Sequence, residues 1–115
     1  MGLGYSLLVR PMLALMDSEK AHTRALLGLR AVSFTVFGRM LLRVLYRPRQ
    51  LESKCLEMDF RNPLGLAAGM DKKAEVMHGW ETLGFGFMEI GGVTEHEQVG
   101  NPKPRMFRSA KHEAL

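Results

Sequence analysis

The stretch from Asn62 to Glu75, NPLGLAAGMDKKAE, constrains the fold of this chain more than any other feature of its sequence. Its apolar run, residues 64–69, is rich in small residues and predicts a short buried strand whose backbone another surface can approach closely. Charged residues follow immediately from Asp71 to Glu75, as in the first turn of a helix. A strand, a small-residue turn and a helix start form the geometry in which backbone N–H groups point at a bound anion. Tight packing requires the same small residues, so this stretch alone does not distinguish a ligand site from a packing site.

A second strand is predicted on the far side of that helix. The helix is expected to extend from Lys72 to Leu83 and to end at Gly84, a residue type typical of helix C-termini. The residues expected on its buried face are Ala74, Met77, Trp80 and Leu83. The second strand is expected over residues 85–94, with loop from residue 95 onward. A strand–helix–strand unit predicts two parallel strands joined by a right-handed crossover, so the fold class is α/β.

Ahead of this unit, alternating apolar and polar residues from Lys54 to Phe60 predict one half-buried strand. It contains Cys55, the only cysteine, which has no partner for an internal disulfide; this favours a reducing compartment. We expect the thiol of Cys55 to be buried or half-buried. The other histidines besides His22 are His78, His96 and His112, and their spacing fits no metal site, so no metal is expected.

The positive charge of the chain is concentrated in its first half. Residues 1–50 carry eight Lys or Arg and two acidic residues, a net charge of +6, whereas residues 51–115 carry eight basic and ten acidic residues, a net charge of −2. The first half is also rich in apolar runs, but arginines interrupt them before they reach the roughly 18 residues of a membrane span. The N-terminus lacks the charged region before an apolar core that is typical of a cleaved signal.

Helix signals organise this half of the sequence. Asp17 or Ser18 is a plausible N-cap for a helix that continues through residue 29. Gly28 weakens that helix, Gly38 is the expected point of division, and Pro48 ends the helical part. A basic amphipathic helix of this kind can lie on an anionic membrane surface or pack on its own domain with a solvated basic face, and the pattern leaves both interpretations open. No nucleic-acid partner is expected, because no binding motif accompanies the basic charge.

Three motifs, taken together in their order and spacing, carry a more specific interpretation. NPLGLAAGMDKKAE, LGFGFMEIGGVT from Leu83 and GNPKPRMFR from Gly100 resemble the class 2, quinone-linked dihydroorotate dehydrogenases. Upstream, MDSEKAH from Met16 resembles the LDPExAH segment of that family, with Ser18 in place of its proline. The resemblance extends from about Met12 to the last residues, nearly the whole chain.

The resemblance implies a (β/α)₈ TIM barrel preceded by a membrane-facing helical segment. Residues 1–50 would form the basic amphipathic quinone and membrane segment, and residues 51–115 the start of the barrel that binds flavin mononucleotide (FMN). A complete barrel needs about 250 residues, so we expect this chain to be an N-terminal portion with an incomplete barrel. The implied reaction is oxidation of dihydroorotate to orotate in pyrimidine biosynthesis, with electrons passing through FMN to a membrane quinone. We expect the 115 residues alone to be inactive.

The implied FMN-binding residues are Ala67, Ala68, Gly69, Met70, Asp71, Lys72 and Gly92. Lys72 would also bind the substrate, since a fixed ammonium group stabilises negative charge on reduced flavin and pairs with an anionic substrate. At Gly92 the family has Thr or Ser, whose hydroxyl contacts the flavin, and Thr94 lies two residues beyond. The resemblance therefore implies weaker flavin binding at this edge.

The implied quinone-site residues are Ala21, His22, Ala25 and Arg108. The imidazole and the guanidinium group are suited to hydrogen bonding with a quinone carbonyl. The catalytic base of the family, a serine on a later strand, has no counterpart in this sequence, so no catalytic residue is assigned.

The absence of a transit-type segment favours a peripheral position on the cytoplasmic face of a bacterial inner membrane over the mitochondrial inner membrane. The alternative to the enzyme is a non-catalytic, basic helical module that associates with membranes.

Overall fold

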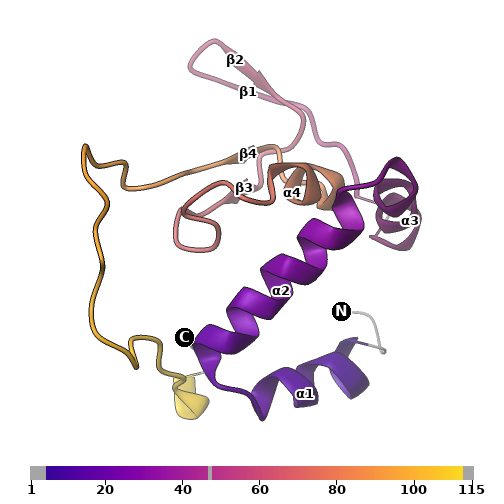
Figure 1. Cartoon of the computed structure of the whole chain (residues 1–115). Coiled ribbons are helices and arrows are strands. Elements are labelled where there is room, and N and C mark those ends of the chain that lie inside the picture. The colour runs from indigo at the N-terminus through magenta and orange to yellow at the C-terminus, as the bar shows by residue number, and fades with distance from the viewer. Residues whose placement is uncertain (1–4, 47, 113–115) are drawn as a thin grey trace. The chain divides into compact units, whose positions relative to one another are not determined.

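The computed structural model of the chain describes residues 5–46 and 48–112. It contains two compact units, one formed by residues up to Ala25 together with those from Glu97, the other by residues 26–96. The division of function at residue 50 stays a prediction. Figure 1 labels helices α1 to α4 and strands β1 to β4. In chain order they are η1 (Tyr5–Val9), α1 (Arg10–Ala14), α2 (Ser18–Ser33), α3 (Val36–Tyr46), β1 (Ser53–Cys55), β2 (Met58–Phe60), β3 (Gly65–Leu66), α4 (Met77–Leu83), β4 (Phe87–Met88) and η2 (Ala110–His112).

Helix α2 begins where its capping residues predict. Asp17 Oδ1 accepts the backbone N–H of Lys20 at 3.1 Å, the bond by which an N-cap residue satisfies a free donor of the first turn. Pro11 occupies the first turn of α1, where its missing N–H costs little. The predicted N-cap is confirmed.

The break between α2 and α3 lies at Phe34 and Thr35, not at Gly28 or Gly38. Gly28 lies inside α2, so the helix continues through it, and its weakening effect stays a prediction. Thr35 ends the break as an N-cap, because its Oγ1 accepts the backbone N–H of Gly38 at 3.0 Å. Gly38 is needed there for space, since a Cβ on it would lie 1.8 Å from the carbonyl oxygen of Val32.

No described helix is by itself long and apolar enough to span a membrane. Helices α2 and α3 meet the length and composition criteria only as a pair, and the pair is bent by 112°.

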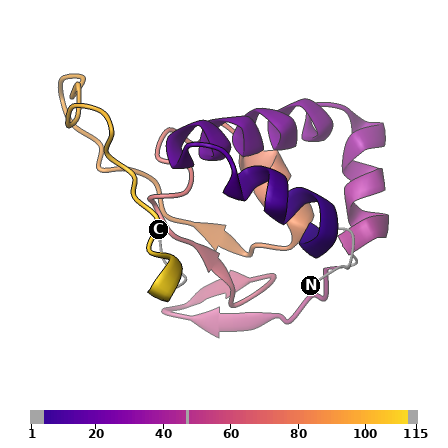
Figure 2. The same ribbon diagram turned by 90° about the horizontal axis from the view of Figure 1, so that it is seen from below.

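The predicted strand from Lys54 to Phe60 is a hairpin instead. β1 and β2 pair antiparallel with Cys55 opposite Met58 (Figure 2), and Leu56 and Glu57 turn the chain with φ angles of 49° and 64°. Alternation of apolar and polar residues does not reveal such a turn, because neither residue is a Gly or Asn that would signal left-handed backbone. The thiol of Cys55 is exposed, so the expectation of a buried or half-buried cysteine is wrong.

The predicted strand–helix–strand unit is present, with shorter elements. β3 and β4 are parallel, with Gly65 opposite Phe87 and Leu66 opposite Met88, which confirms the parallel pair and the α/β fold class. Gly84 ends α4 with φ of 103°, a left-handed conformation that glycine adopts without cost. The expected start of α4 at Lys72 is wrong: the helix begins at Met77, after a segment of turns.

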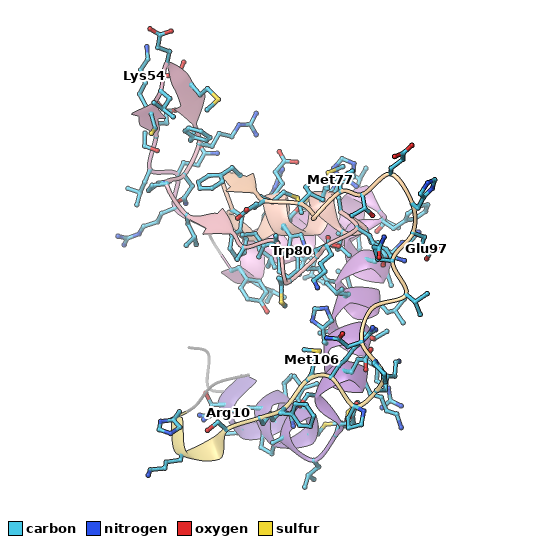
Figure 3. All side chains as sticks on the ribbon, turned by 90° about the vertical axis from the view of Figure 1, so that its left-hand side faces the viewer. Arg10, Lys54, Met77, Trp80, Glu97 and Met106 are labelled. Carbon is cyan, nitrogen blue, oxygen red and sulfur yellow. The ribbon has the colours of Figure 1, made fainter. Side chains whose placement is uncertain are left out.

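The core of the second unit lies where α4 packs on β3 and on the later part of α2. Its buried residues are Leu66, Val76 and Trp80, and the half-buried residues around them are Leu26, Leu29, Leu83, Phe85 and Met88. Figure 3 labels Trp80. Trp80 and Phe85 pack edge to face with ring centroids 5.7 Å apart. Val76 therefore takes the inward position predicted for Met77, whose side chain is half exposed.

Candidate functional site

The ends of β3 and β4 bring two of the predicted flavin-contacting segments to one edge. The strands are parallel neighbours, and the N–H of Glu89 donates to the carbonyl of Leu66 at 2.9 Å just beyond the paired residues. Residues 67–69 follow one strand, and residues 90–92 follow the other. The carboxyl ends of parallel strands meet at the same edge of a sheet, which is where α/β proteins place their binding residues.

This edge has open backbone at two glycines. Residues 67–70 form a turn, in which the N–H of Met70 donates to the carbonyl of Ala67 at 3.1 Å. A Cβ added at Gly69 or at Gly92 would meet no heavy atom within 4 Å. A planar group can therefore approach the backbone at both glycines, as the small-residue pattern predicts.

The side chain of Asp71, a predicted flavin contact, is buried. Asp71 is 3% exposed, and its carboxylate accepts hydrogen bonds from its own loop and from α4. Oδ1 accepts the backbone N–H of Glu75 at 2.9 Å, and Oδ2 accepts the backbone N–H of Val76 at 2.9 Å and the indole N–H of Trp80 at 3.1 Å. The carboxylate thus faces the protein interior, and only the backbone of Asp71 remains for the predicted flavin contact.

Lys72 and Lys73 lie in the turn between Asp71 and α4, and both are exposed. Among residues 5–46 and 48–112, no hydrogen bond or ion pair engages the ammonium group of Lys72, and Lys72 does not belong to a helix. An exposed, unpaired cation next to the small-residue turn is compatible with the predicted role in binding an anionic group, which stays a prediction.

Gly92 has no side chain to offer a ligand, and the nearest hydroxyl along the chain is engaged elsewhere. Thr94 Oγ1 donates to the backbone carbonyl of His96 at 2.6 Å, within its own loop. Thr94 therefore does not replace the hydroxyl that the family motif has at position 92.

The predicted quinone-site residues belong to the first unit. On α2, Ala21 is buried, His22 is half-buried and Ala25 is exposed. The guanidinium group of Arg108 donates to three backbone carbonyls at the end of α1, those of Leu13, Ala14 and Met16, each at 2.9 Å; these three bonds are made by Nη1 and Nη2. Such bonds satisfy the carbonyls that a helix leaves free at its C-terminus. Arg108 thus holds the end of α1, and no bond between Arg108 and His22 is seen in the described part of the chain.

A second arginine of the same motif, Arg105, contacts α2. Arg105 donates from Nε and Nη2 to Glu19 Oε1 at 3.1 and 2.7 Å, and Lys103 Nζ lies 3.2 Å from the same oxygen. The hydrogen bond from Arg105 lowers the pKa of Glu19 below its ordinary value of 4.5; desolvation opposes this shift and Lys103 adds to it. Sequence reasoning missed both Glu19 and Arg105, since nothing local connects residues 86 positions apart.

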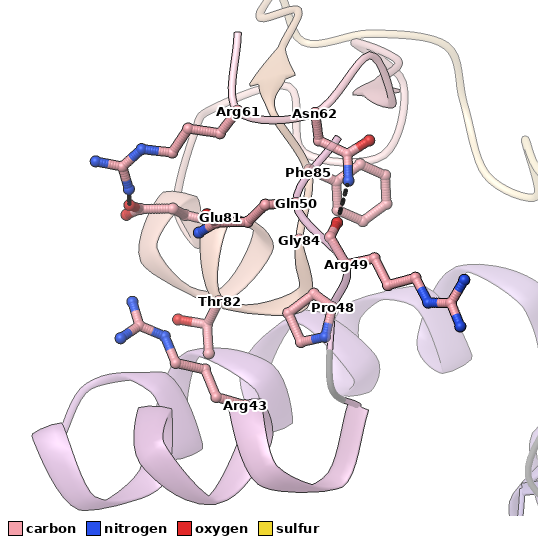
Figure 4. Close-up of a pocket in the computed structure, with 10 residues that line it drawn as sticks. All are labelled: Arg43, Pro48, Arg49, Gln50, Arg61, Asn62, Glu81, Thr82, Gly84 and Phe85. Carbon is pink, nitrogen blue, oxygen red and sulfur yellow. Dashed lines mark hydrogen bonds and ion pairs between the residues drawn. The ribbon is translucent and has the colours of Figure 1, made fainter. Parts of the chain in front are cut away.

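A cavity of about 400 Å³ lies elsewhere in the second unit (Figure 4). Its charged lining residues are Arg43, Arg49, Arg61 and Glu81. Two bonds cross it: Arg61 Nη1 donates to Glu81 Oε1 at 3.2 Å, and Asn62 Nδ2 donates to the carbonyl of Arg49 at 2.9 Å. None of the residues predicted to bind flavin, substrate or quinone lines this cavity.

Within the described residues, no group of three or more His, Cys, Asp or Glu side chains is placed to hold a metal ion.

Comparisons with known proteins identify the family. The family model described as dihydroorotate dehydrogenase matches residues 50–115. A protein of Gloeobacter violaceus named dihydroorotate dehydrogenase (quinone) is 50% identical over 102 residues, which are 88% of this chain and 29% of that protein. Proteins of the same name from Flavobacterium lutescens and Polynucleobacter asymbioticus are 45% and 46% identical over 94% and 96% of this chain. The chain spans about 30% of the length of these relatives. The matched range includes both segments at the edge described above, residues 67–69 and 90–92, and the chain belongs to the dihydroorotate dehydrogenase family.

Proposed function

We propose that this chain contributes the N-terminal part of a quinone-linked dihydroorotate dehydrogenase, which oxidises dihydroorotate to orotate in pyrimidine biosynthesis. The observation that carries the proposal is the parallel pair β3–β4, whose carboxyl ends place an open, small-residue turn beside an exposed lysine. In this proposal β3 and β4 are the first two strands of a (β/α)₈ barrel, and residues 51–115 are its start. Residues of the remaining barrel supply the catalytic base, because none of the residues here is assigned that role.

FMN is the proposed cofactor, and the residues at the edge fit a flat ring with backbone donors around it. Ala67, Ala68, Gly69 and Met70 would lie along it, with Gly92 at the opposite side. When bound, the flavin supplies the acceptor for a hydride from dihydroorotate. The role of Lys72 is to hold a fixed positive charge against the reduced ring and against the carboxylate of the substrate. The carboxylate of Asp71 takes no part in flavin contact.

The electron acceptor is proposed to be a membrane quinone that binds near Ala21, His22 and Ala25. Arg108 serves this site by fixing the end of α1 through its three carbonyl bonds. Those three bonds do not use its Nε. A direct hydrogen bond from Arg108 to quinone would therefore come from Nε or from another N–H group that the three bonds do not use.

The membrane surface is proposed to be anionic and to contact α3. Seven large apolar residues of α3 are exposed: Val36, Phe37, Met40, Leu41, Val44, Leu45 and Tyr46. At 100° per residue all of them except Tyr46 fall on one side of the helix, whereas Arg39 and Arg43 fall on the other. Apolar side chains toward the acyl boundary and arginines at headgroup level are the arrangement of an interfacial helix. The proposed location is the cytoplasmic face of a bacterial inner membrane, with the mitochondrial inner membrane as the alternative.

A second candidate function rests on the same exposed helix face. A non-catalytic module that associates with membranes would need α3 but neither Lys72 nor the open turn. Substitutions at Lys72 separate the two candidates, since they would leave the function of such a module intact.

Complementation tests the enzymatic proposal. The chain is joined at residue 115 to the remaining part of the Gloeobacter violaceus relative, and this product is called the joined enzyme below. We expect the joined enzyme to restore growth without added pyrimidines to a bacterium that lacks its own dihydroorotate dehydrogenase, and the Lys72→Ala form to fail. Equal growth with both forms would contradict the proposal.

A further inference from the structure

The buried carboxylate of Asp71 closes the segment that carries Lys72. Its two oxygens accept three N–H groups, from Glu75, Val76 and Trp80, at 2.9 to 3.1 Å. The backbone carbonyl of Asp71 accepts a fourth, from Ala74 at 3.0 Å. The hydrogen bonds of Asp71 therefore close residues 71–76 into a loop. Lys72 is the next residue in the chain after Asp71.

Three donors on one carboxylate explain why the charge can be buried. Leaving a carboxylate without partners inside a protein is costly, whereas bonds from N–H groups to an ionised oxygen are stronger than neutral ones. An asparagine has nearly the same shape but only one acceptor oxygen, and its NH₂ group would face N–H donors. The site is therefore built for an ionised Asp and not for its amide.

The loop is also held in a backbone conformation that it would not choose freely. Ala74 has φ of 54°, in the left-handed region that residues with a Cβ disfavour. Loss of the Asp71 bonds would allow the loop to relax toward ordinary angles, and Lys72 would move with it. No other described side chain bonds to Lys72, so the loop backbone determines where its ammonium group can reach.

We infer that Asp71 is a positioning residue, which fixes the loop from Lys72 to Val76 so that the Lys72 ammonium group lies against flavin and substrate. The inference rests on the proposed function, because it concerns the role given there to Lys72. It assigns to Asp71 an indirect part in catalysis: its carboxylate touches neither the substrate nor the flavin.

The joined enzyme allows a test with four forms: parent, Asp71→Asn, Lys72→Ala and the double variant. A fixed cation beside the flavin stabilises its reduced, negatively charged state, so Lys72→Ala should lower the reduction potential of the bound flavin. Asp71→Asn should lower the potential in the same direction and reduce kcat/KM for dihydroorotate about 10- to 100-fold, the loss typical of a misplaced reacting group. In the double variant the potential should equal that of Lys72→Ala alone, because Asp71 acts through Lys72.

A merely structural role gives a different result. It would lower the melting temperature of Asp71→Asn but leave the flavin potential unchanged, and this outcome overturns the inference while the proposed function stands. A Lys72→Ala form with the turnover and potential of the parent overturns the proposed function and the inference together.

Two further measurements test the inference even if the Asp71→Asn form folds poorly. Asp71→Glu keeps the carboxylate but lengthens the side chain by one methylene. We expect it to lower the reduction potential of the flavin as Asp71→Asn does. Hydrogen exchange of the Glu75 and Val76 amides measures whether their hydrogen bonds to Asp71 persist, and it does not depend on enzyme activity. We expect faster exchange in both Asp71 variants. Unchanged exchange and unchanged potential in Asp71→Glu contradict the inference.

Discussion

Asp71 and Lys72 are adjacent in the sequence, but their side chains lie in opposite environments. The carboxylate is buried and accepts three hydrogen bonds, whereas the ammonium group is exposed and unpaired among the described residues. A turn permits this because consecutive side chains there leave the backbone in different directions. At this scale the structure separates a residue that holds the loop from one that is available to a ligand.

The first prediction concerns Lys72. In the joined enzyme, Lys72→Ala should lower kcat at least about 100-fold, the scale seen when one preorganised electrostatic group is removed. Lys73→Ala is the matched control, since Lys73 is also exposed in the same turn and has no proposed ligand. A steady-state assay of dihydroorotate-dependent quinone reduction compares the two, and equal losses would show that the lysines act only through general charge.

The second prediction concerns Gly92. Gly92→Thr should bind flavin more tightly, because a Cβ there meets no atom within 4 Å and the new hydroxyl restores one contact. One neutral hydrogen bond contributes about 0.5–1.5 kcal/mol, or roughly a 2- to 12-fold lower Kd. Flavin titration of the joined enzyme measures this change.

Gly91→Thr serves as the control for that experiment. Gly91 has φ of 116°, and a Cβ on it would lie 2.9 Å from the backbone nitrogen of Val93, so the same substitution should destabilise the protein. Unchanged flavin affinity in Gly92→Thr would show that the missing hydroxyl at position 92 does not affect flavin binding.

The third prediction follows from the lowered pKa of Glu19. A carboxyl group whose pKa is lower in the folded than in the unfolded state stabilises the fold above its ordinary value of 4.5, and this stabilisation is lost as the pH falls through the folded-state pKa. Acidification from about pH 6 to about pH 3 should therefore loosen the contacts of Arg105 and Lys103 with α2. Hydrogen exchange of residues 97–112, corrected for the intrinsic effect of pH, should show this loosening.

Glu19→Gln is the control for the pH experiment. Gln cannot titrate, so the exchange of residues 97–112 should be fast at both pH values. A pH dependence that persists in Glu19→Gln would show that another group controls this segment.

At the level of elements, periodicity and capping signals predicted which helices and strands exist better than where they begin. The parallel pair and the caps at Asp17 and Gly84 were predictable, because they depend on local residue types. Two features were not: the hairpin turn at Leu56 and Glu57, and the late start of α4. Both depend on left-handed backbone at residues with a Cβ, which only tertiary contacts stabilise.

The candidate site likewise has features that were predictable from the sequence and features that were not. The open turn at residues 67–70 and the exposed Lys72 follow from residue types in the motif. The inward carboxylate of Asp71 does not, because its donors are brought to it by the fold of the loop and helix that follow. The contacts of Arg105 and Arg108 do not either, because their partners lie 86 to 95 residues away. Sequence spacing carries no information about such partners.

The fourth prediction concerns the exposed face of α3. The full chain should bind vesicles that contain anionic lipid, and binding should weaken with salt, since charges are screened over about 8 Å at physiological ionic strength. Phe37→Asp and Val44→Asp should abolish binding because they place charge in the apolar face, whereas Val99→Asp, at a residue even more exposed but outside α3, should not. Co-sedimentation at low salt tests this, and no partition of the unmodified chain would contradict the membrane contact.

At the scale of the whole molecule, little apolar surface is buried. Among the described residues the buried hydrophobic side chains are Ala21, Leu66, Val76 and Trp80, while strand β4 and the loops after it expose Phe87, Ile90 and Val93. Parallel strands are ordinarily covered on both faces. In the proposed complete barrel, further strands and helices would cover these residues, and the late-strand loops would bind the flavin phosphate. We therefore expect the 115-residue chain alone to show helix by circular dichroism without a cooperative melting transition.

The central claim is that these residues form one part of a flavin site that the rest of a barrel completes. The direct measurement is to purify the chain alone and the joined enzyme in excess FMN, then record the visible spectrum and dihydroorotate-dependent quinone reduction of each. The account predicts a stoichiometric flavin spectrum and turnover for the joined enzyme, and neither for the chain alone. Stoichiometric flavin with turnover in the chain alone, or a joined enzyme that folds yet binds no flavin, would contradict it.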